Sequence, residues 1–283
     1  MIGVFDSGVG GLSVWKEIVR ELPGVPTLYL ADQAHVPYGP RPLEEVRRFA
    51  EGITRFLLKQ GATVVVLACH TASAAALRYL RSTFPRVPFV GMEPAVKPAV
   101  QRTHNGRVGV IATWATFQGE LFASLLARFG QDVQVIPHVC PGLVEAVEAG
   151  ALDTPETEAL LRACLEPLLA AGIDELVLGC THYPFLRPLI DRIVGPGVEI
   201  IDPAPAVARQ VRRILEGRDA NARSAGQPPA PHTFYTTGDP VRLMRALERL
   251  VGIRTEVQAL HWEGNEIAFP AAPGAYPPLT ARE

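Results

Sequence analysis

Two cysteines stand in similar sequence surroundings, and their side chains could carry acid–base chemistry. Cys69 ends the stretch VVVLAC at 64–69, and Cys180 ends ELVLGC at 175–180. A thiolate is a good base, although a free thiol has a pKa of about 8.5 and needs activation. Two thiols on opposite faces of one carbon could invert it, because one removes a proton and the other returns one from behind. The pair therefore predicts racemisation or epimerisation without a cofactor; the alternative is two small buried residues.

Polar residues surround both thiols in the sequence. His70 follows Cys69, and Thr181 and His182 follow Cys180. We expect Asp6 to lie near Cys69, where the carboxyl would take up or steer a proton and would not lower the thiol pKa. A helix N-terminus after each strand would favour the thiolate.

The other two cysteines, Cys140 and Cys164, carry no such pattern. The chain has no C-x-x-C pair, so a zinc ribbon is not indicated. The histidines lack metal-ligand spacing, and we predict no metal site. All four cysteines are expected to be free thiols.

A glycine-rich turn, DSGVGG at 6–11, follows the first predicted strand. Such a turn exposes backbone N–H groups that bind anions. A dinucleotide site would require G-x-G-x-x-G, but Ser13 breaks that pattern and Asp6 would repel a phosphate. The pattern favours a small carboxylate held by Ser7 and the turn amides; the alternative is a plain tight turn.

Two further segments could contribute polar groups. Tyr38 and Gly39 lie in a Pro- and Gly-rich loop at 32–42. Glu145 and Glu148 lie on a predicted short helix, in the equivalent place of the second half of the chain. Taken alone, each segment is more typical of a turn or a solvated helix face.

The elements that must position these residues form an alternating strand–helix pattern, which predicts βαβ units and a parallel sheet. The pattern occurs twice. IGVFDS at 2–7 is echoed by VGVIAT at 108–113, an offset of 108 − 2 = 106, and the two cysteine stretches are offset by 175 − 64 = 111. Duplicated domains are the simplest explanation. Because ligands bind beyond the carboxyl ends of parallel strands, both cysteines would then face one cleft.

We therefore predict an α/β fold of two pseudo-symmetric parallel-sheet αβα lobes, with the active site in the cleft between them. Residues 1–95 plus 206–265 would form the first lobe and 96–205 the second. Residues 266–283 are predicted to form a Pro-rich C-terminal tail, whose end, FPAAPGAYPPLTARE at 269–283, is expected to be poorly ordered.

The composition excludes several classes of protein. The 283 residues carry a formal net charge of −2, so there is no basic field for nucleic acid. No apolar run approaches the ~20 residues needed to span a bilayer. The N-terminal segment lacks the basic flank and apolar core of a signal peptide, which favours the cytoplasm, where disulfides are rare.

Five segments resemble, in the same order, the signature segments of the cofactor-independent glutamate racemases. They are DSGVGG at 6–11, VPYG at 36–39, LACHTAS at 67–73, CPGLVEAVEAG at 140–150 and GCTHYPFL at 179–186. The resemblance runs from residue 2 to about 210 and continues more weakly to about 260.

The resemblance implies two-base racemisation of glutamate without a cofactor, supplying D-glutamate for peptidoglycan, by a homodimer. It implies that Cys69 faces D-glutamate with help from Asp6. Cys180 would face L-glutamate with help from Glu148 and His182. The substrate would be bound by Asp6, Ser7, Tyr38, Gly39, His70, Thr71, Thr113, Thr116, Thr181 and His182.

One position departs from the family pattern. The family reads A-C-N-T, whereas this chain has His70 between Cys69 and Thr71. An imidazole can titrate near neutrality, so this departure bears on substrate contact and pH profile. It keeps open a racemase for aspartate or a related amino acid. A third reading is a two-lobed binding protein for a small acid.

Overall fold

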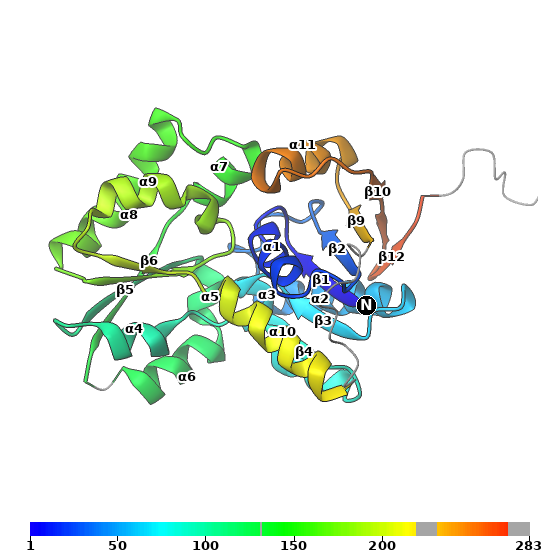
Figure 1. The fold of residues 1–283 in the computed structure, drawn as a ribbon, viewed down its shortest axis with the longest axis horizontal. Helices are drawn as coiled ribbons and strands as arrows, with labels where there is room; N and C mark the ends of the chain where they lie inside the picture. Colours follow the sequence, from blue (N-terminus) through cyan, green and yellow to red (C-terminus); the bar gives the residue numbers. More distant parts are fainter. Residues whose placement is uncertain (131, 219–230, 271–283) are drawn as a thin grey trace, which may run out of the picture.

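The computed structural model describes residues 1–130, 132–218 and 231–270, which form two parallel sheets and a small antiparallel pair (Figure 1). The first sheet has the strand order β10-β9-β2-β1-β3-β4 and the second β6-β5-β7-β8. The first comprises β1 (Ile2–Asp6), β2 (Thr27–Ala31), β3 (Val64–Leu67), β4 (Phe89–Gly91), β9 (His232–Thr236) and β10 (Val257–Ala259). The second comprises β5 (Arg107–Ala112), β6 (Gln134–Val139), β7 (Glu175–Gly179) and β8 (Glu199–Ile201).

The duplication predicted from the sequence is confirmed by the topology. The orders β2-β1-β3-β4 and β6-β5-β7-β8 are the same arrangement, with the echoed segments β1 and β5 as inner strands. The echoed strands β3 and β7 each lie beside them, and all these pairings are parallel. The two cysteine stretches therefore occupy equivalent places in two similar lobes.

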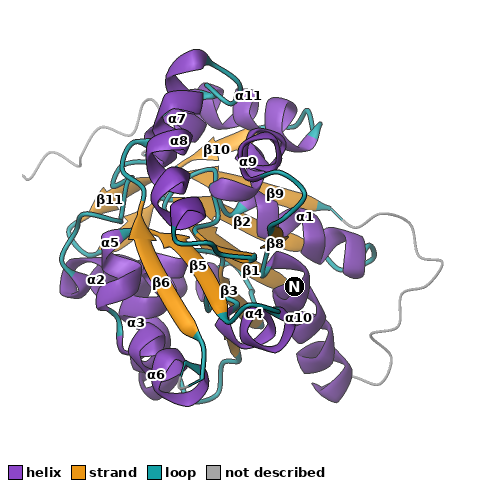
Figure 2. Cartoon of the chain, turned by 90° about the vertical axis from the view of Figure 1, so that its left-hand side faces the viewer, coloured by secondary structure: helices purple, strands orange, loops and turns teal. Residues whose placement is uncertain are grey.

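Helices cover both faces of each sheet, which explains why the inner strands are apolar throughout. In the first lobe α1 (Leu12–Glu21) packs with α10 (Ala204–Arg218) on one face, and α2 (Leu43–Lys59) packs with α3 (His70–Thr83) on the other. In the second lobe α4 (Val96–Arg102) packs with α6 (Glu120–Phe129) on one face of the sheet. On the other face α8 (Pro155–Ala170) packs with α9 (Arg187–Val194). Figure 2 shows the same layers from the side.

The chain passes between the lobes twice. It leaves the first lobe between β4 and α4, and it returns between β8 and α10. The returning chain adds α10, β9, α11 (Pro240–Val251) and β10 to the first lobe. The first sheet is thus completed by the last third of the sequence.

Two predicted elements differ from those observed. The sequence pattern predicts one helix at about 116–129, whereas the structure has two, α5 (Trp114–Gln118) and α6, separated at Gly119. A Cβ at Gly119 would lie 2.6 Å from Cβ of Ala74, so the close approach of α3 requires glycine there. The sequence also predicts one strand within 254–262, whereas the structure has β10 and β11 (His261–Glu263), and β11 pairs with β12 (Glu266–Ala268).

Part of the predicted tail is therefore structured, since β12 lies within 266–283. Residues 271–283 lie outside the described residues. So does most of the polar, Pro- and Gly-bearing segment 216–231, for which the sequence predicts a surface loop. Within the described ranges, no helix has the length and apolar character that crossing a bilayer would require.

Candidate active site

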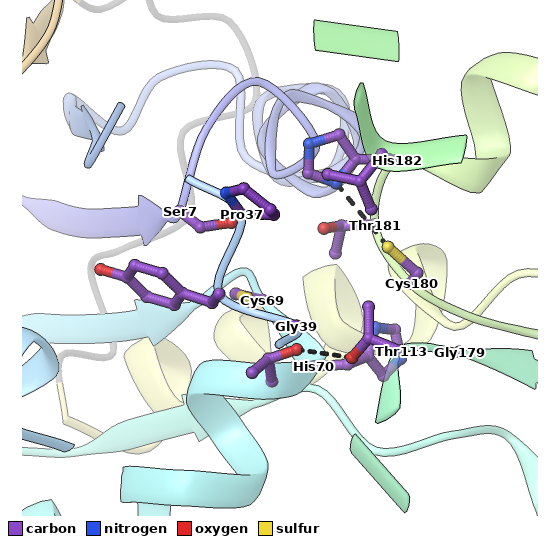
Figure 3. A pocket seen from close by; sticks show the side chains of 13 residues that line it. Ser7, Pro37, Gly39, Cys69, His70, Thr113, Gly179, Cys180, Thr181 and His182 are labelled. Carbon is purple, nitrogen blue, oxygen red and sulfur yellow. Dashed lines mark hydrogen bonds between the residues drawn. The ribbon is translucent and has the colours of Figure 1, made fainter. Parts of the chain in front are cut away.

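A pocket lies between the lobes, at the carboxyl ends of β1, β3 and β7, where the strand-end rule predicts a ligand site. Cys69 enters it from the first lobe and Cys180 from the second (Figure 3). The first lobe also contributes Ser7, Pro37, Tyr38, Gly39, His70 and Thr71, and the second contributes Thr113, Val144, Gly179, Thr181 and His182. The structure thus brings together most of the residues singled out in the sequence.

The predicted residues Asp6, Glu148 and Thr116 do not line the pocket and lie behind those that do. Asp6 lies close enough to Cys69 to influence its thiol, Glu148 contacts His182, and Thr116 contacts Thr113. These three residues are therefore placed to act through their neighbours.

Cys69 is the N-cap residue of α3, and its Sγ accepts a hydrogen bond from Ala72 N at 3.5 Å. That contact favours the thiolate, as the sequence predicted. Burial and the nearby Asp6 carboxylate nevertheless raise the pKa of Cys69 well above its ordinary value. Burial also raises the pKa of Asp6, whose Oδ1 has no hydrogen-bond partner among the described residues. This arrangement suits a thiol that holds its proton until it donates it.

Cys180 has different partners. Its Sγ lies 3.7 Å from Nδ1 of His182, and Nε2 of that ring lies 2.8 Å from Oε1 of Glu148. Burial alone would lower the pKa of His182, but contacts with Cys180 and Glu148 raise it well above its ordinary value. The pKa of Glu148 is lowered by His182 in spite of burial. A protonated imidazole beside Cys180 stabilises the thiolate, so this side of the pocket suits a base.

The glycine-rich turn at 6–11 packs against Glu148 and His182, which form the relay beside Cys180. A Cβ at Gly8 would lie 1.9 Å from Oε1 of Glu148, and a Cβ at Gly10 would lie 2.3 Å from Nδ1 of His182. Only glycine permits this contact between the lobes.

The predicted role of the turn amides is not supported for three of them, which are already occupied. The N–H groups of Gly8 and Gly11 donate to Oδ2 of Asp6 at 3.4 and 2.7 Å, and that of Val9 donates to Oε1 of Glu148 at 2.7 Å. Of the two predicted contributors, Ser7 and the turn amides, Ser7 lines the pocket. The turn therefore positions the two carboxylates and does not present these amides to a substrate.

Three threonine hydroxyls from both lobes meet at one edge of the pocket. Oγ1 of Thr71 lies 2.8 Å from that of Thr113 and 3.4 Å from that of Thr116, and the last two are 2.9 Å apart. Thr113 caps α5 and Thr71 lies in the first turn of α3. Hydroxyls can turn to donate to a carboxylate, so this cluster is suited to one end of an amino acid.

His70 is buried, and neither ring nitrogen has a hydrogen-bond partner among the described residues. Burial lowers the pKa of His70 to about 3, so the expectation that its imidazole titrates near neutrality is wrong. An unsatisfied buried polar group is costly, and a ligand in the pocket could supply its partner. His70 is thus a neutral hydrogen-bonding group.

Asp32 supports the pocket residue Tyr38 and was not predicted from the sequence. It is fully buried, and its Oδ2 accepts from Tyr38 Oη at 2.6 Å and contacts Nδ1 of His35 at 2.9 Å. Its Oδ1 accepts from Thr237 Oγ1 at 2.7 Å and from Trp262 Nε1 at 2.8 Å. Asp32 follows β2 directly, so the strand-end rule could have identified it. It holds Tyr38, which lines the pocket.

The prediction that all four cysteines are free thiols is wrong for two of them. Cys140 and Cys164 form a disulfide, with Cα atoms 5.4 Å apart, whereas Cys69 and Cys180 are free and buried. Packing of α8 beside the end of β6 brings the two sulfurs together, and a sequence separation of 24 gives no motif for this. Among the described residues, no cluster of His, Cys, Asp and Glu could hold a metal ion.

The pocket is nearly closed in this structure. Its open space is about 20 Å³, which is room for about one water molecule and not for an amino acid. A substrate can therefore enter only if the lobes or the loops between them move apart.

Two parallel-sheet lobes that close over one free thiol from each define a two-base amino-acid racemase, a cofactor-independent isomerase. Comparisons with known proteins agree. Residues 2–211 match the family model described as Asp/Glu/hydantoin racemase. The glutamate racemase of Pseudomonas aeruginosa is 52% identical over 251 residues, covering 89% of this chain and 94% of that protein.

Solved structures show the same fold. The glutamate racemase isoform RacE1 of Bacillus anthracis aligns with a TM-score of 0.84 and 35% identity, covering 94% of this chain and 98% of that one. The Escherichia coli glutamate racemase, solved with L-glutamate and the activator UDP-MurNAc-Ala, has a TM-score of 0.79 and 32% identity, covering 91% and 97%. The chain belongs to the Asp/Glu/hydantoin racemase family and, within it, to the glutamate racemases.

Proposed function

We propose that this protein interconverts L-glutamate and D-glutamate by moving the α-proton between two thiols, Cys69 and Cys180. The observation that carries the proposal is that one free thiol from each lobe lines the same pocket. A protein that only bound a small acid would have no need of thiols on both sides. The E. coli relative was solved with L-glutamate, which supports glutamate as the substrate.

In the L-to-D direction, the Cys180 thiolate takes the α-proton and forms a thiol. The electron pair left on the α-carbon delocalises into the carboxylate. Cys69 then donates its proton to the opposite face, giving D-glutamate and a Cys69 thiolate. The D-to-L direction runs the same steps in reverse. Asp6 assists Cys69, and His182 with Glu148 assists Cys180, as their contacts and pKa shifts support.

The barrier lies in forming the carbanion, since the α-proton is weakly acidic. Hydrogen bonds placed in advance stabilise the carboxylate as it gains enolate character. We assign this role to the hydroxyl cluster of Thr71, Thr113 and Thr116. The remaining substrate contacts are assigned to Ser7, Tyr38, Gly39, His70 and Thr181.

Racemisation can be tested directly. Purified protein without added cofactor should convert each glutamate enantiomer to the racemate, followed by circular dichroism. Cys69→Ala and Cys180→Ala should each abolish turnover, because each removes one acid–base group. Cys164→Ala is the matched control, since this buried cysteine lies outside the pocket, and it should keep its activity. Full activity in either pocket variant would remove that thiol from the mechanism.

We further propose that the enzyme supplies D-glutamate for peptidoglycan in the cytoplasm. Membership of the glutamate racemases supports this, and the disulfide is the one feature unusual for that compartment. Rapid alkylation of growing cells, followed by mass spectrometry, would report whether the Cys140–Cys164 bond exists there.

We propose that the segments 1–95 plus 206–265 and 96–205 are the units that separate when substrate enters.

A homodimer is also proposed, from the resemblance to the family. Sedimentation at micromolar concentration tests it, and a species of 30.6 kDa alone would contradict it.

A further inference from the structure

A second cleft is lined by Glu148 but not by His182. It lies between α11 of the first lobe and α7 (Leu143–Ala149) of the second, two helices that lie side by side in Figures 1 and 2. Its open space is about 180 Å³, far more than that of the catalytic pocket. Val147, Glu148 and Gly150 line one wall, and Arg242, Arg245 and Arg249 line the other. The cleft is thus bounded by both lobes.

The three arginines lie three and four positions apart on α11, so their side chains share one helix face. Nη1 of Arg249 donates to the carbonyl oxygen of Gly150 at 2.9 Å. The side chains of Arg242 and Arg245 form no hydrogen bond or ion pair with any residue that the structure describes. Two guanidinium groups therefore face the cleft with their donors free.

Glu148 does not neutralise these arginines. Its Oε1 is engaged by Val9 N and by Nε2 of His182, and its Oε2 accepts from Gln33 Nε2 at 3.3 Å. Its side chain is only 9% exposed. Among the described residues lining the cleft it is the one carboxylate, so the cleft carries an excess of positive charge.

We propose that this cleft binds a soluble molecule through a phosphate or diphosphate group, held by Arg242 and Arg245. Planar guanidinium groups match phosphate oxygens with paired hydrogen bonds, and two of them favour a multiply charged anion over chloride. The open space admits such a group without displacing Arg249 from Gly150.

The site has a consequence for turnover, and this step rests on the proposed function. Glu148 orients His182 beside Cys180, so an anion in the cleft adds negative charge next to that relay. L- and D-glutamate have equal free energies, so the equilibrium constant is one with or without a bound anion. Any change in kcat/KM must therefore be the same factor in both directions.

Isothermal titration with inorganic pyrophosphate tests the site. Equilibrated glutamate at saturation fills the catalytic pocket, and sodium chloride holds the ionic strength constant. The parent protein should bind one equivalent saturably, and Arg242→Gln/Arg245→Gln should weaken binding at least tenfold. Arg48→Gln/Arg213→Gln, which removes two arginines outside the cleft, should leave it unchanged.

Absence of saturable binding to the parent, or equal binding by the cleft variant, would overturn the site. Pyrophosphate at saturation should change kcat/KM at least twofold, equally in both directions, in the parent and not in the cleft variant. Saturable binding with both rates unchanged would overturn the link to the relay. The binding measurement needs no turnover, so its failure is distinct from failure of the racemase assignment.

Discussion

The two thiols differ in their electrostatic surroundings, although their sequence contexts echo each other. Cys69 lies beside an acid that raises its pKa, and Cys180 lies beside an imidazole held by Glu148. The thiol of Cys69 therefore lies beside an acid, whereas the sulfur of Cys180 lies beside an imidazole whose pKa is raised. This asymmetry gives the two relays separately testable pH behaviour.

Replacing Glu148 by Gln keeps the shape of the side chain and removes its charge. Because Glu148 raises the pKa of His182, that pKa should fall, and the protonated imidazole should be lost at lower pH. We expect kcat/KM to fall roughly tenfold or more and its alkaline limb to move to lower pH. The measurement is a pH–rate profile in both directions, with Glu145→Gln, an exposed glutamate on the same helix, as control. If the alkaline limb of the Glu148→Gln profile does not move, the proposal that Glu148 acts through His182 is wrong.

His70 offers a second test at a single side chain. His70→Leu removes the hydrogen-bonding ring, and we expect KM for glutamate to rise about tenfold, equivalent to one lost hydrogen bond. His70→Asn should restore most of the affinity. The pH profile between 6 and 8 should be the same in all three proteins, because the pKa of His70 is about 3. Unchanged KM in His70→Leu would make His70 a spectator. Comparing aspartate with glutamate in each protein shows whether this residue selects the substrate.

At the scale of helices and strands, one covalent bond between elements lies outside the pocket. The Cys140–Cys164 disulfide joins the end of β6 to α8, across the segment that carries α7 and Glu148. Closing a loop of this length stabilises a fold by roughly 3 kcal/mol.

Cys164→Ala should therefore lower the free energy of unfolding by about 2–4 kcal/mol under oxidising conditions. Denaturant titration measures this. With a reducing agent the parent should lose most of that difference, which separates the bond from the packing of the sulfur. Equal stability of parent and variant without reductant would show that the bond contributes nothing.

Glu175 opens β7 at the end of the sheet remote from the pocket. Burial, together with Glu199 on the neighbouring strand, raises its pKa to about 7 from 4.5. The folded state therefore holds this proton more tightly than the unfolded chain. The associated stability is complete below about pH 4.5 and is lost as pH rises through about 7.

Glu175→Gln should then raise the thermal midpoint relative to the parent at pH 8 and change it little at pH 5. Thermal unfolding at the two pH values measures the difference. Glu44→Gln, an exposed carboxylate on α2, is the matched control and should show no such trend. A variant that gains nothing at pH 8 would contradict the assignment.

Sequence patterns predicted the strands, because short apolar runs mark them. They also predicted that Cys69 and Cys180 face one pocket, because the repeat places both at equivalent strand ends. Asp32 follows β2 directly, but two of the four groups that it binds, Thr237 and Trp262, lie more than 200 positions away in the chain, so its place in a buried network had no local signal. The disulfide was missed because its two cysteines meet only through packing of α8. The Val9 amide of the 6–11 turn is occupied by Glu148 from the other lobe, which no local pattern encodes.

Across the whole molecule, the duplicated lobes supply one acid–base group each and meet over a pocket of about 20 Å³. The small volume means that the lobes, or the loops between them, must move apart to admit substrate. Closure excludes water, which strengthens the hydrogen bonds that stabilise the carbanion. Two chain crossings, between β4 and α4 and between β8 and α10, are the places where such a motion would bend the backbone.

Deuterium incorporation tests most directly whether two thiols flank one stereocentre. Each glutamate enantiomer is incubated with the enzyme in deuterated water, and both pools are analysed early by mass spectrometry. Removal by one group and return from the other face should put solvent deuterium into the product, while recovered substrate stays protiated. Equal early labelling of substrate and product would mean that a single group exchanges the proton on both faces, and the account would be wrong.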